Sequence, residues 1–510
     1  MSDFPWLTTL GAVPLVGAAV VAAMPAARAD LVKRVALGFS LLTLVVAVAM
    51  TTQFDTGTAG ELQLTESHSW IPQFGVTYSL GIDGIALALI LLSVVLTPVC
   101  LLASWHDADR GQRGVGTFFA LMLSLETMMI GVFAATDVFL FYVFFEAMLI
   151  PMYFIIGSFG GPQRSYAAVK FLLYSLLGGL LMLAAVIGLF VASGGGDHAF
   201  LLSNLVGIKL DPGVEKLLFL GFFVAFAIKA PLWPVHTWLP DAAAEAPPGG
   251  AVLLVGVLDK VGTFGMIRYC LPLFPNASKW AAPVVVTLCV IGILYGALLA
   301  IGQSDIKRLI AYTSISHFGF IALGIFAMTS QAQAGSTLYM VNHGFSTAAL
   351  FLVAGFMISR RGSRQIEDFG GVQRVAPMLA GTFLLAGLSS LALPGLSSFV
   401  SEFLVLVGTY TRYQVAAIVA TAGIVLAALY ILILYQRTMT GPVTEATKGT
   451  RDLDRRELAV VAPLLAVIIA LGVYPKPLLD VIEPAVSTTL QQVHVKDPAP
   501  VQPVAERGSR

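Results

Sequence analysis

The sequence has 510 residues, of which 57% are hydrophobic and only 11% are charged, and its formal net charge is zero. Because soluble domains carry about 25% charged residues, this composition excludes a soluble globular chain, and the charge balance gives no sign of a nucleic-acid partner. Long apolar runs follow one another from end to end, which predicts an all-α integral membrane protein with one large membrane domain.

Fourteen runs are apolar enough to cross a bilayer, which takes about 20 helical residues, although the seventh is short and the twelfth is long. In chain order they lie at residues 5–25, 31–51, 84–104, 115–135, 138–158, 166–192, 216–230, 249–272, 280–303, 307–328, 334–358, 376–410, 413–437 and 458–474. Residues 52–83 are polar and aromatic, and Val76–Leu80 is predicted to form a strand at the membrane surface. The Pro-rich segment after Tyr474 is expected to lie outside the bilayer.

Positive residues predict the orientation, because loops on the cytoplasmic or matrix side carry more lysine and arginine. The loops after odd-numbered runs hold 18 of the 29 Lys and Arg residues, and the opposite side holds 9. The other two, Lys229 and Lys260, lie within apolar sequence. This alternation supports the number of runs and places both termini away from the cytoplasm.

Prolines interrupt the seventh and twelfth runs. Pro231, Pro234 and Pro240 remove backbone donors just after Lys229, and Pro394 does so more weakly before Glu402. Freed backbone groups at membrane depth are tolerated only inside protein or beside a wet cavity, and paired broken helices mark ion sites in transporters built from inverted repeats. An ordinary proline kink is the alternative, mainly for the second break.

The two breaks lie five runs apart, which predicts two inverted five-helix repeats with broken helices 7 and 12. Residues 1–114 would then hold runs one to three and a surface hairpin, and residues 115–272 would form the first repeat. Residues 273–440 would form the second repeat, and residues 441–510 the last span and a polar tail. The repeat is inferred from the pattern alone, because letter-for-letter similarity between the halves is faint.

Several ionisable side chains lie at similar depth inside the runs, where each costs about 2.5–3.5 kcal/mol on insertion scales. Any one of them can be a structural ion pair or a satisfied core histidine, but structure alone does not need so many. They are Glu126, Glu146, Lys229, Lys260 with its neighbour Asp259, His317, His343 and Glu402.

Such a row can move protons. Burial and neighbouring charges shift the pKa of carboxyl, lysine and imidazole groups in opposite directions, so the approach of a carboxylate can switch a buried lysine between holding and losing its proton. A neutral imidazole accepts on one nitrogen and donates from the other. Thr313, Ser314 and Ser316 are polar neighbours suited to hold relay waters. The sequence therefore predicts a proton path in the plane of the membrane.

No cofactor is expected in this chain. Cys100, Cys270 and Cys289 lie in or beside apolar runs without CxxC spacing, whereas a zinc or iron–sulfur site needs closely grouped thiolates. The sequence also contains neither a Gly-rich nucleotide loop after a strand nor an HExxH motif. We interpret the cysteines as packed thiols and expect no metal site.

Six motifs resemble the proton-pumping membrane subunits of NADH:quinone oxidoreductase (complex I) and the related Mrp-type sodium/proton antiporters. The similarity extends from about residue 70 to 440. The motifs are Phe226–Ala242, Tyr78–Ile85, Phe145-Glu146-Ala147, Leu258-Asp259-Lys260, Lys307–Ser314 and Asn342-His343. Within that family, Glu402, the length and the number of runs are most similar to the chain-M or chain-4 type.

The resemblance implies a role for each charged residue. Glu146 would pair with Lys229 and tune its pKa, and Lys229 would be the central proton carrier. His236 and His317 would relay protons toward Lys260, and Glu402 would be the exit group toward the non-cytoplasmic side. Glu126, His343 and Asp259 would be weaker members of the path.

The resemblance also implies partners. The chain would be one subunit of a proton-translocating NADH:ubiquinone reductase, beside two related antiporter-like subunits and lipid, with redox chemistry and quinone binding in other subunits. Transported species would be protons and water, in a bacterial inner membrane rather than a mitochondrial one. A free-standing or Mrp-type antiporter, a hydrogenase-complex subunit and a passive scaffold are the alternatives, and the scaffold leaves the buried charges unexplained.

Overall fold

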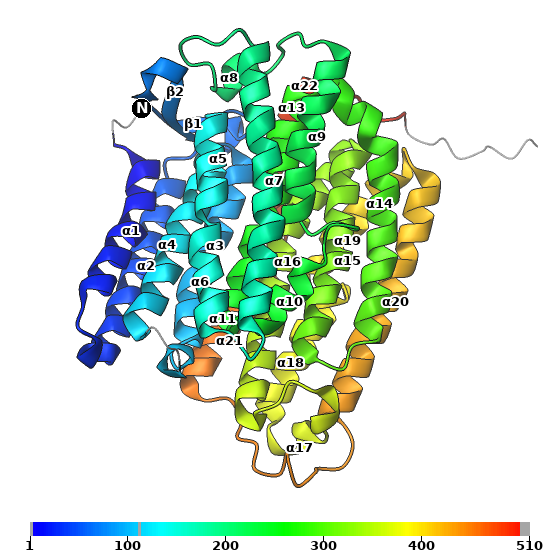
Figure 1. Cartoon of the computed structure of the whole chain (residues 1–510). Helices are drawn as coiled ribbons and strands as arrows, with labels where there is room; N and C mark the ends of the chain where they lie inside the picture. Colours follow the sequence, from blue (N-terminus) through cyan, green and yellow to red (C-terminus); the bar gives the residue numbers. More distant parts are fainter. Residues whose placement is uncertain (1–3, 111–113, 500–510) are drawn as a thin grey trace, which may run out of the picture.

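The computed structural model describes residues 4–110 and 114–499, which form a bundle of long helices standing side by side (Figure 1). Twelve helical segments of this described part are long and apolar enough to cross a membrane, which confirms the predicted membrane fold. They are α1 (Trp6–Ala23), α2 (Ala29–Thr51), α3 (Gly84–Ala103), α4 (Val115–Ala134), α5 with α6 (Val138–Ala147, Leu149–Phe159), α7 (Arg164–Ala192), α11 to α13 (Pro248–Leu273), α14 (Pro275–Ile301), α15 (Ile306–Ala327), α16 (Ser330–Arg361), α20 (Gln414–Met439) and α21 (Arg455–Val473).

Both predicted helix breaks are present. The first break separates α9 (Pro212–Lys229), which contains most of the seventh run, from α10 (Trp238–Glu245). The second break separates α18 (Pro377–Ser390) from α19 (Ser397–Tyr410) within the twelfth run. In Figure 1, α9 lies above α10 whereas α18 lies below α19, so the two broken pairs run in opposite directions. This arrangement fits an inverted repeat, while the division at residues 115–272 and 273–440 stays a prediction, as does the count of fourteen spans.

Three further irregularities were not predicted from the sequence. Helix α5 ends at Ala147 and α6 begins at Leu149, so the fifth span is interrupted directly after Glu146. In the eighth span, α11 (Pro248–Leu253) and α12 (Asp259–Gly265) are separated by the π-helical segment η5 (Leu254–Leu258). A second π-helical segment, η6 (Met266–Cys270), separates α12 from α13 (Leu271–Leu273). Insertions of this kind are frequent at functional sites.

One end of the bundle carries a β-hairpin, so the fold is not purely helical. Strands β1 (Gln63–Ile71) and β2 (Val76–Ile82) pair antiparallel, and the predicted strand Val76–Leu80 lies within β2. We call this end the hairpin side and the opposite end, where α17 (Val372–Val375) lies, the basic-loop side, after Arg360, Arg361 and Arg364, which come shortly before α17 in the chain (Figure 1). The remaining short elements are η1 (Ala26–Arg28), η2 (Thr56–Thr58), η3 (Pro72–Phe74), η4 (Asp107–Arg110), α8 (Leu202–Leu205), η7 (Ile366–Asp368) and α17 (Val372–Val375).

The segment after Tyr474 is not merely a polar tail. It forms the amphipathic helix α22 (Lys476–Val493), whose apolar face packs on α3 and α16 at the hairpin side. A Cβ at Gly84, the first residue of α3, would overlap the backbone oxygen of Val481, so the two helices meet at van der Waals contact. Glycine is the only residue that permits this approach.

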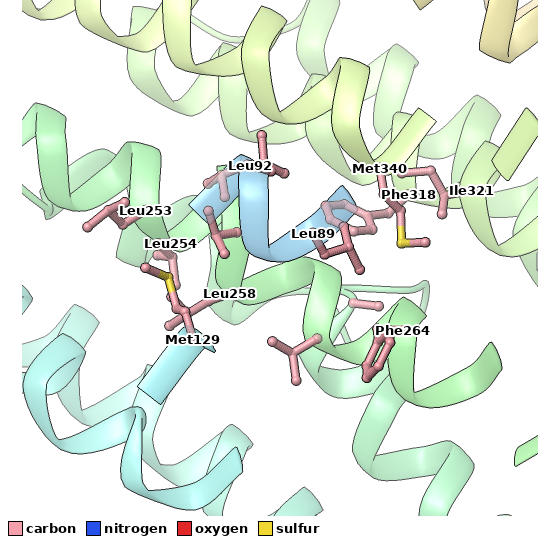
Figure 2. Packing of buried hydrophobic residues seen from close by; sticks show 14 of the residues in the cluster. Leu89, Leu92, Met129, Leu253, Leu254, Leu258, Phe264, Phe318, Ile321 and Met340 are labelled. Carbon is pink, nitrogen blue, oxygen red and sulfur yellow. The ribbon is translucent and has the colours of Figure 1, made fainter. Parts of the chain in front are cut away.

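The inner and outer helices of the bundle differ in how much of each helix is buried inside the protein. The most apolar windows of α15 and α16 are 94% buried and that of the span containing α12 is 100% buried, against 28% for α21 and 33% for α1. Figure 2 shows side chains from α3, α12, α15 and α16 meeting at the centre, among them Leu89, Phe264, Phe318 and Met340. The charged residues on these inner helices are therefore shielded by protein rather than lipid.

Candidate functional site

Lys229 lies at the point where α9 breaks. The indole nitrogen of Trp238 donates to the Ile228 carbonyl at 2.9 Å, which satisfies a backbone oxygen freed by the break. The Lys229 side chain is 1% exposed, and its Nζ has no hydrogen-bond partner. The Nζ lies over the Phe145 ring, 4.6 Å from the ring centroid. Burying an ionisable side chain with no hydrogen bond is costly, so the presence of Lys229 at this position indicates a functional role.

Glu146 is the charged residue of α5, and it lies within electrostatic range of Lys229. The two groups are not in direct contact, because Glu146 Oε1 and Lys229 Nζ both lack a hydrogen-bond partner. Gly179 of α7 makes room for Glu146, since a Cβ at that position would overlap the carboxylate. The pair is therefore separated but held in place, which is the arrangement that a pair able to open and close requires.

Replacing Gly179 tests this arrangement without altering any charge. We expect Gly179→Ala to displace the Glu146 carboxylate and to lower proton translocation as strongly as Glu146→Gln does, by about tenfold or more for a positioned proton-transfer group. Gly381→Ala is the matched control, because a Cβ on Gly381 meets nothing within 4 Å. Equal translocation rates in the two glycine variants would show that the position of Glu146 does not matter.

Lys260 is held by a backbone carbonyl of the π-helical segment η5. Its Nζ donates to the Val255 carbonyl at 2.6 Å and lies 2.7 Å from His343 Nδ1 of α16. Lys260 is fully buried, as is Asp259, whose two carboxyl oxygens have no partner. Asp259 lies within electrostatic range of both Lys229 and Lys260.

The two histidines continue the row from Lys260. The ring centroids of His343 and His317 are 5.3 Å apart, with His317 on the neighbouring helix α15. His343 Nε2 has no partner in the described part of the chain. The predicted order therefore changes: His343, expected to be a weaker member, contacts Lys260 directly, and His317 lies one step further away.

Two tyrosines that were not among the predicted residues contact His317. The Tyr339 hydroxyl hydrogen-bonds His317 Nδ1, and the Tyr430 hydroxyl lies 3.4 Å from His317 Nε2. Both hydroxyls lie within electrostatic range of Glu402, which is 3% exposed. Tyr339 comes four residues before His343, one helical turn away on the same face, and this spacing is the signal that could have revealed it.

The structure does not bring two predicted site residues into this row. Glu126 is fully buried but faces α2, where Ser40 Oγ donates to its carboxylate at 3.3 Å, and its second oxygen has no partner. His236 packs edge-on against Tyr295 of α14, with ring centroids 5.2 Å apart. The contacts of the described residues therefore give no direct link from His236 to Lys260.

The described residues 4–110 and 114–499 contain no group of three or more His, Cys, Asp or Glu side chains that could hold a metal ion. All three cysteines are free and buried, on separate spans. The side chains described above are all of types that can bind and release a proton: a carboxylate, two lysines, an aspartate, two imidazoles, two phenols and a further carboxylate.

Comparisons with known proteins agree with this chemistry. A family model described as "NADH:quinone oxidoreductase/Mrp antiporter, TM" matches residues 135–428. NADH-quinone oxidoreductase subunit M of Mycobacterium tuberculosis is 54% identical over 534 aligned residues, which cover 98% of this chain and 96% of that protein. The protein of the same description from Rhodobacter capsulatus is 41% identical, and the alignment covers 96% of this chain and 97% of that protein.

Solved structures share the same architecture. A chain of respiratory complex I from Thermus thermophilus with bound NADH superposes with a TM-score of 0.87 at 31% identity, covering 96% of this chain and 99% of that chain. A chain of the Mrp complex from Dietzia sp. DQ12-45-1b superposes with a TM-score of 0.86 at 22% identity, covering 97% of this chain and all of that chain. The second similarity shows the fold alone.

Proposed function

The chain belongs to the NADH:quinone oxidoreductase/Mrp antiporter transmembrane family, and from this premise we propose that it is the proton-translocating subunit M of a respiratory NADH:quinone oxidoreductase. Its partners are the other membrane subunits of that complex, including the two related antiporter-like subunits, and lipid. The relatives at 54% and 41% identity are bacterial, which places this multi-pass protein in a bacterial inner membrane. Redox chemistry takes place in other subunits and drives this chain from a distance.

The observation that carries the proposal is the chain of contacts from Lys260 through His343 and His317 to Tyr339. Each member can accept a proton on one side and release one on the other, either directly or through a water. Together with Glu146 and Lys229 before it and Glu402 after it, the row extends through both predicted repeats. A passive scaffold would not need this continuity.

We infer that Lys229 is the first carrier and Glu402 the last. When Glu146 approaches Lys229, their attraction stabilises the charged lysine, and when it withdraws, the proton moves on toward Lys260. Moving one charge against 100 mV costs about 2.3 kcal/mol, and a pKa change of two units is worth about 2.7 kcal/mol. One opening and closing of the pair is therefore of the right size to drive one proton.

A deletion strain tests the function as a whole. We expect membrane vesicles without this chain to lose NADH-driven proton uptake, and vesicles with the chain restored to regain it. A free-standing sodium/proton antiporter predicts the opposite pattern, because it would exchange sodium for protons in vesicles that receive no NADH. Sodium-dependent pH changes in the absence of NADH, with respiration unaltered by the deletion, would overturn the assignment.

A further inference from the structure

Two buried lysines of the row each lie over the face of a phenylalanine ring. The Lys229 Nζ lies 4.6 Å from the centroid of Phe145, and the Lys260 Nζ lies 5.0 Å from the centroid of Phe318. All four side chains are at most 1% exposed. An ammonium within about 6 Å of an aromatic centroid is attracted by the negative face of the ring, and the attraction is strongest where water is absent. Both contacts therefore belong to the stronger class of cation–π contacts.

The two phenylalanines occupy comparable places in the chain. Phe145 lies on α5 directly before Glu146, and Phe318 lies on α15 directly after His317. Helix α5 belongs to the fifth apolar run and α15 to the tenth, so the two are five runs apart, as the two broken helices are. Each ring therefore accompanies a residue of the row in a corresponding span of the two predicted repeats.

Neighbouring aromatic side chains fix the orientation of both rings. Phe145 packs against Phe141 of α5 and meets Phe226 of α9 edge-to-face, with ring centroids 5.9 and 6.0 Å away. Phe318 meets the His343 ring edge-to-face, with centroids 5.3 Å apart. Because a rotation of either ring would lose these contacts, each ring presents a fixed face to its lysine.

A phenyl ring can stabilise an ammonium without taking its proton. Phenylalanine has no group that binds a proton, whereas a carboxylate in the same place would compete for it. Lys229 Nζ has no hydrogen bond and Glu146 stands apart from it, so in this arrangement the Phe145 face stabilises the ammonium. Successive helical residues point about 100° apart. Phe145 and Glu146 therefore approach Lys229 from different directions.

We propose that Phe145 is a positioning residue that holds the Lys229 ammonium while Glu146 is withdrawn, and that Phe318 supports the Lys260 ammonium in the same way. Lys229 then alternates between a carboxylate, which attracts its charge strongly, and a ring, which attracts it weakly. The ring limits how readily the proton leaves after Glu146 withdraws, so the proton passes along the row rather than escaping early. The proposal rests on the proposed function, because it names what each carrier contacts between transfers.

Fluorination of the ring tests the contact while nearly preserving the packing. Fluorine withdraws electron density from the face of phenylalanine and is only slightly larger than hydrogen, so progressively fluorinated phenylalanines weaken the attraction to a cation in steps. They are introduced at position 145 by nonsense suppression, and NADH-driven proton uptake by vesicles is measured as a function of pH. We expect the alkaline limb of the profile to move to lower pH with each added fluorine, by about one pH unit for the fully fluorinated ring.

The titratable groups near the two lysines are unchanged in these variants. They are Glu146 of α5, Asp259 of α12, His317 of α15 and His343 of α16. Phenylalanine itself does not titrate, so a graded shift of the profile reports on the ammonium that the ring contacts. A ring that only fills space would give no graded shift, because its volume hardly changes.

Phe219 is the matched control for Phe145. It is fully buried on α9, the helix that carries Lys229, but it stacks on Phe223, with ring centroids 5.4 Å apart. The same fluorinated residues at position 219 should leave the pH profile unchanged. An equal shift at 219, or no shift at 145 in an assembled complex, overturns the role of Phe145.

A Phe318 series tests the contact with Lys260 separately. Fluorination at position 318 should also move the alkaline limb to lower pH, whereas Phe326, buried on the same helix against Phe223, should give no shift. Absence of a shift at both 145 and 318 overturns the proposal, and absence at one position excludes that ring. If Lys229→Ala stops uptake while fluorination changes nothing, only the ring contact is wrong. A deletion strain that keeps its uptake refutes the proposed function instead, so the two failures are distinguishable.

Discussion

Lys229→Ala and Lys229→Arg are each expected to abolish most NADH-driven proton uptake while the complex still assembles. Alanine removes the carrier, and arginine stays protonated, so it cannot release a proton to the next group. Assembly is expected to survive because Lys229 Nζ makes no hydrogen bond whose loss would leave a partner unpaired. We expect uptake to fall below about a hundredth of the unaltered rate, because one positioned proton-transfer group contributes about a hundredfold or more.

The measurement is proton uptake by membrane vesicles, with the amount of assembled complex determined in parallel. Lys216→Ala is the matched control, because Lys216 lies on the same helix α9 but near the hairpin side, where its Nζ contacts Trp280 at 5.0 Å from the ring centroid. If both Lys229 variants pump normally, Lys229 is a structural charge and the row is not the path.

Lys260→Met is expected to have the second large effect. It preserves the length of the side chain but removes the donor to Val255 and the contact with His343 Nδ1. The row is then cut between its two halves, and we expect proton uptake to fall by about a hundredfold, within the range reported for proton-transfer groups. Because the Val255 carbonyl loses its partner, some loss of stability is expected as well.

Substitutions of His343 distinguish a role in proton relay from a role in the stability of the protein. His343→Gln can still accept a hydrogen bond from Lys260 but cannot pass a proton from one ring nitrogen to the other, so we expect assembly to be normal and uptake to fall as in Lys260→Met. His198→Gln, an exposed histidine on the hairpin side, should have no effect. Normal uptake in His343→Gln would remove the direct step from Lys260 to His343 from the mechanism.

Sequence reasoning found the residues of the site more readily than their connections. The lysines and Glu402 stand out because a charge inside an apolar run is visible without a structure, and the breaks at Lys229 and Ser397 are visible because proline acts on its own helix. Tyr339 and Tyr430 stood out less, because an uncharged tyrosine inside an apolar run does not carry the cost of a charge, and only the spacing of Tyr339 from His343 gave a signal. Glu126, at a depth similar to that of Glu146 and expected to be a weaker member of the path, faces Ser40 on the outer helix α2.

By itself, the sequence determined the membrane fold, the broken helices and the set of mid-depth charges, because hydropathy and proline geometry act along the chain. Only the tertiary structure decided which charges meet: His343 with Lys260, His317 with the tyrosines, and Glu126 with none of them. The physical reason is that an inner helix such as α16 is buried on all sides, with 94% of its most apolar window inside the protein, so no alternation of exposed and buried faces tells which face meets which neighbour. The packing of neighbouring helices, together with the π-helical segments on either side of α12, sets how each inner helix is rotated about its own axis.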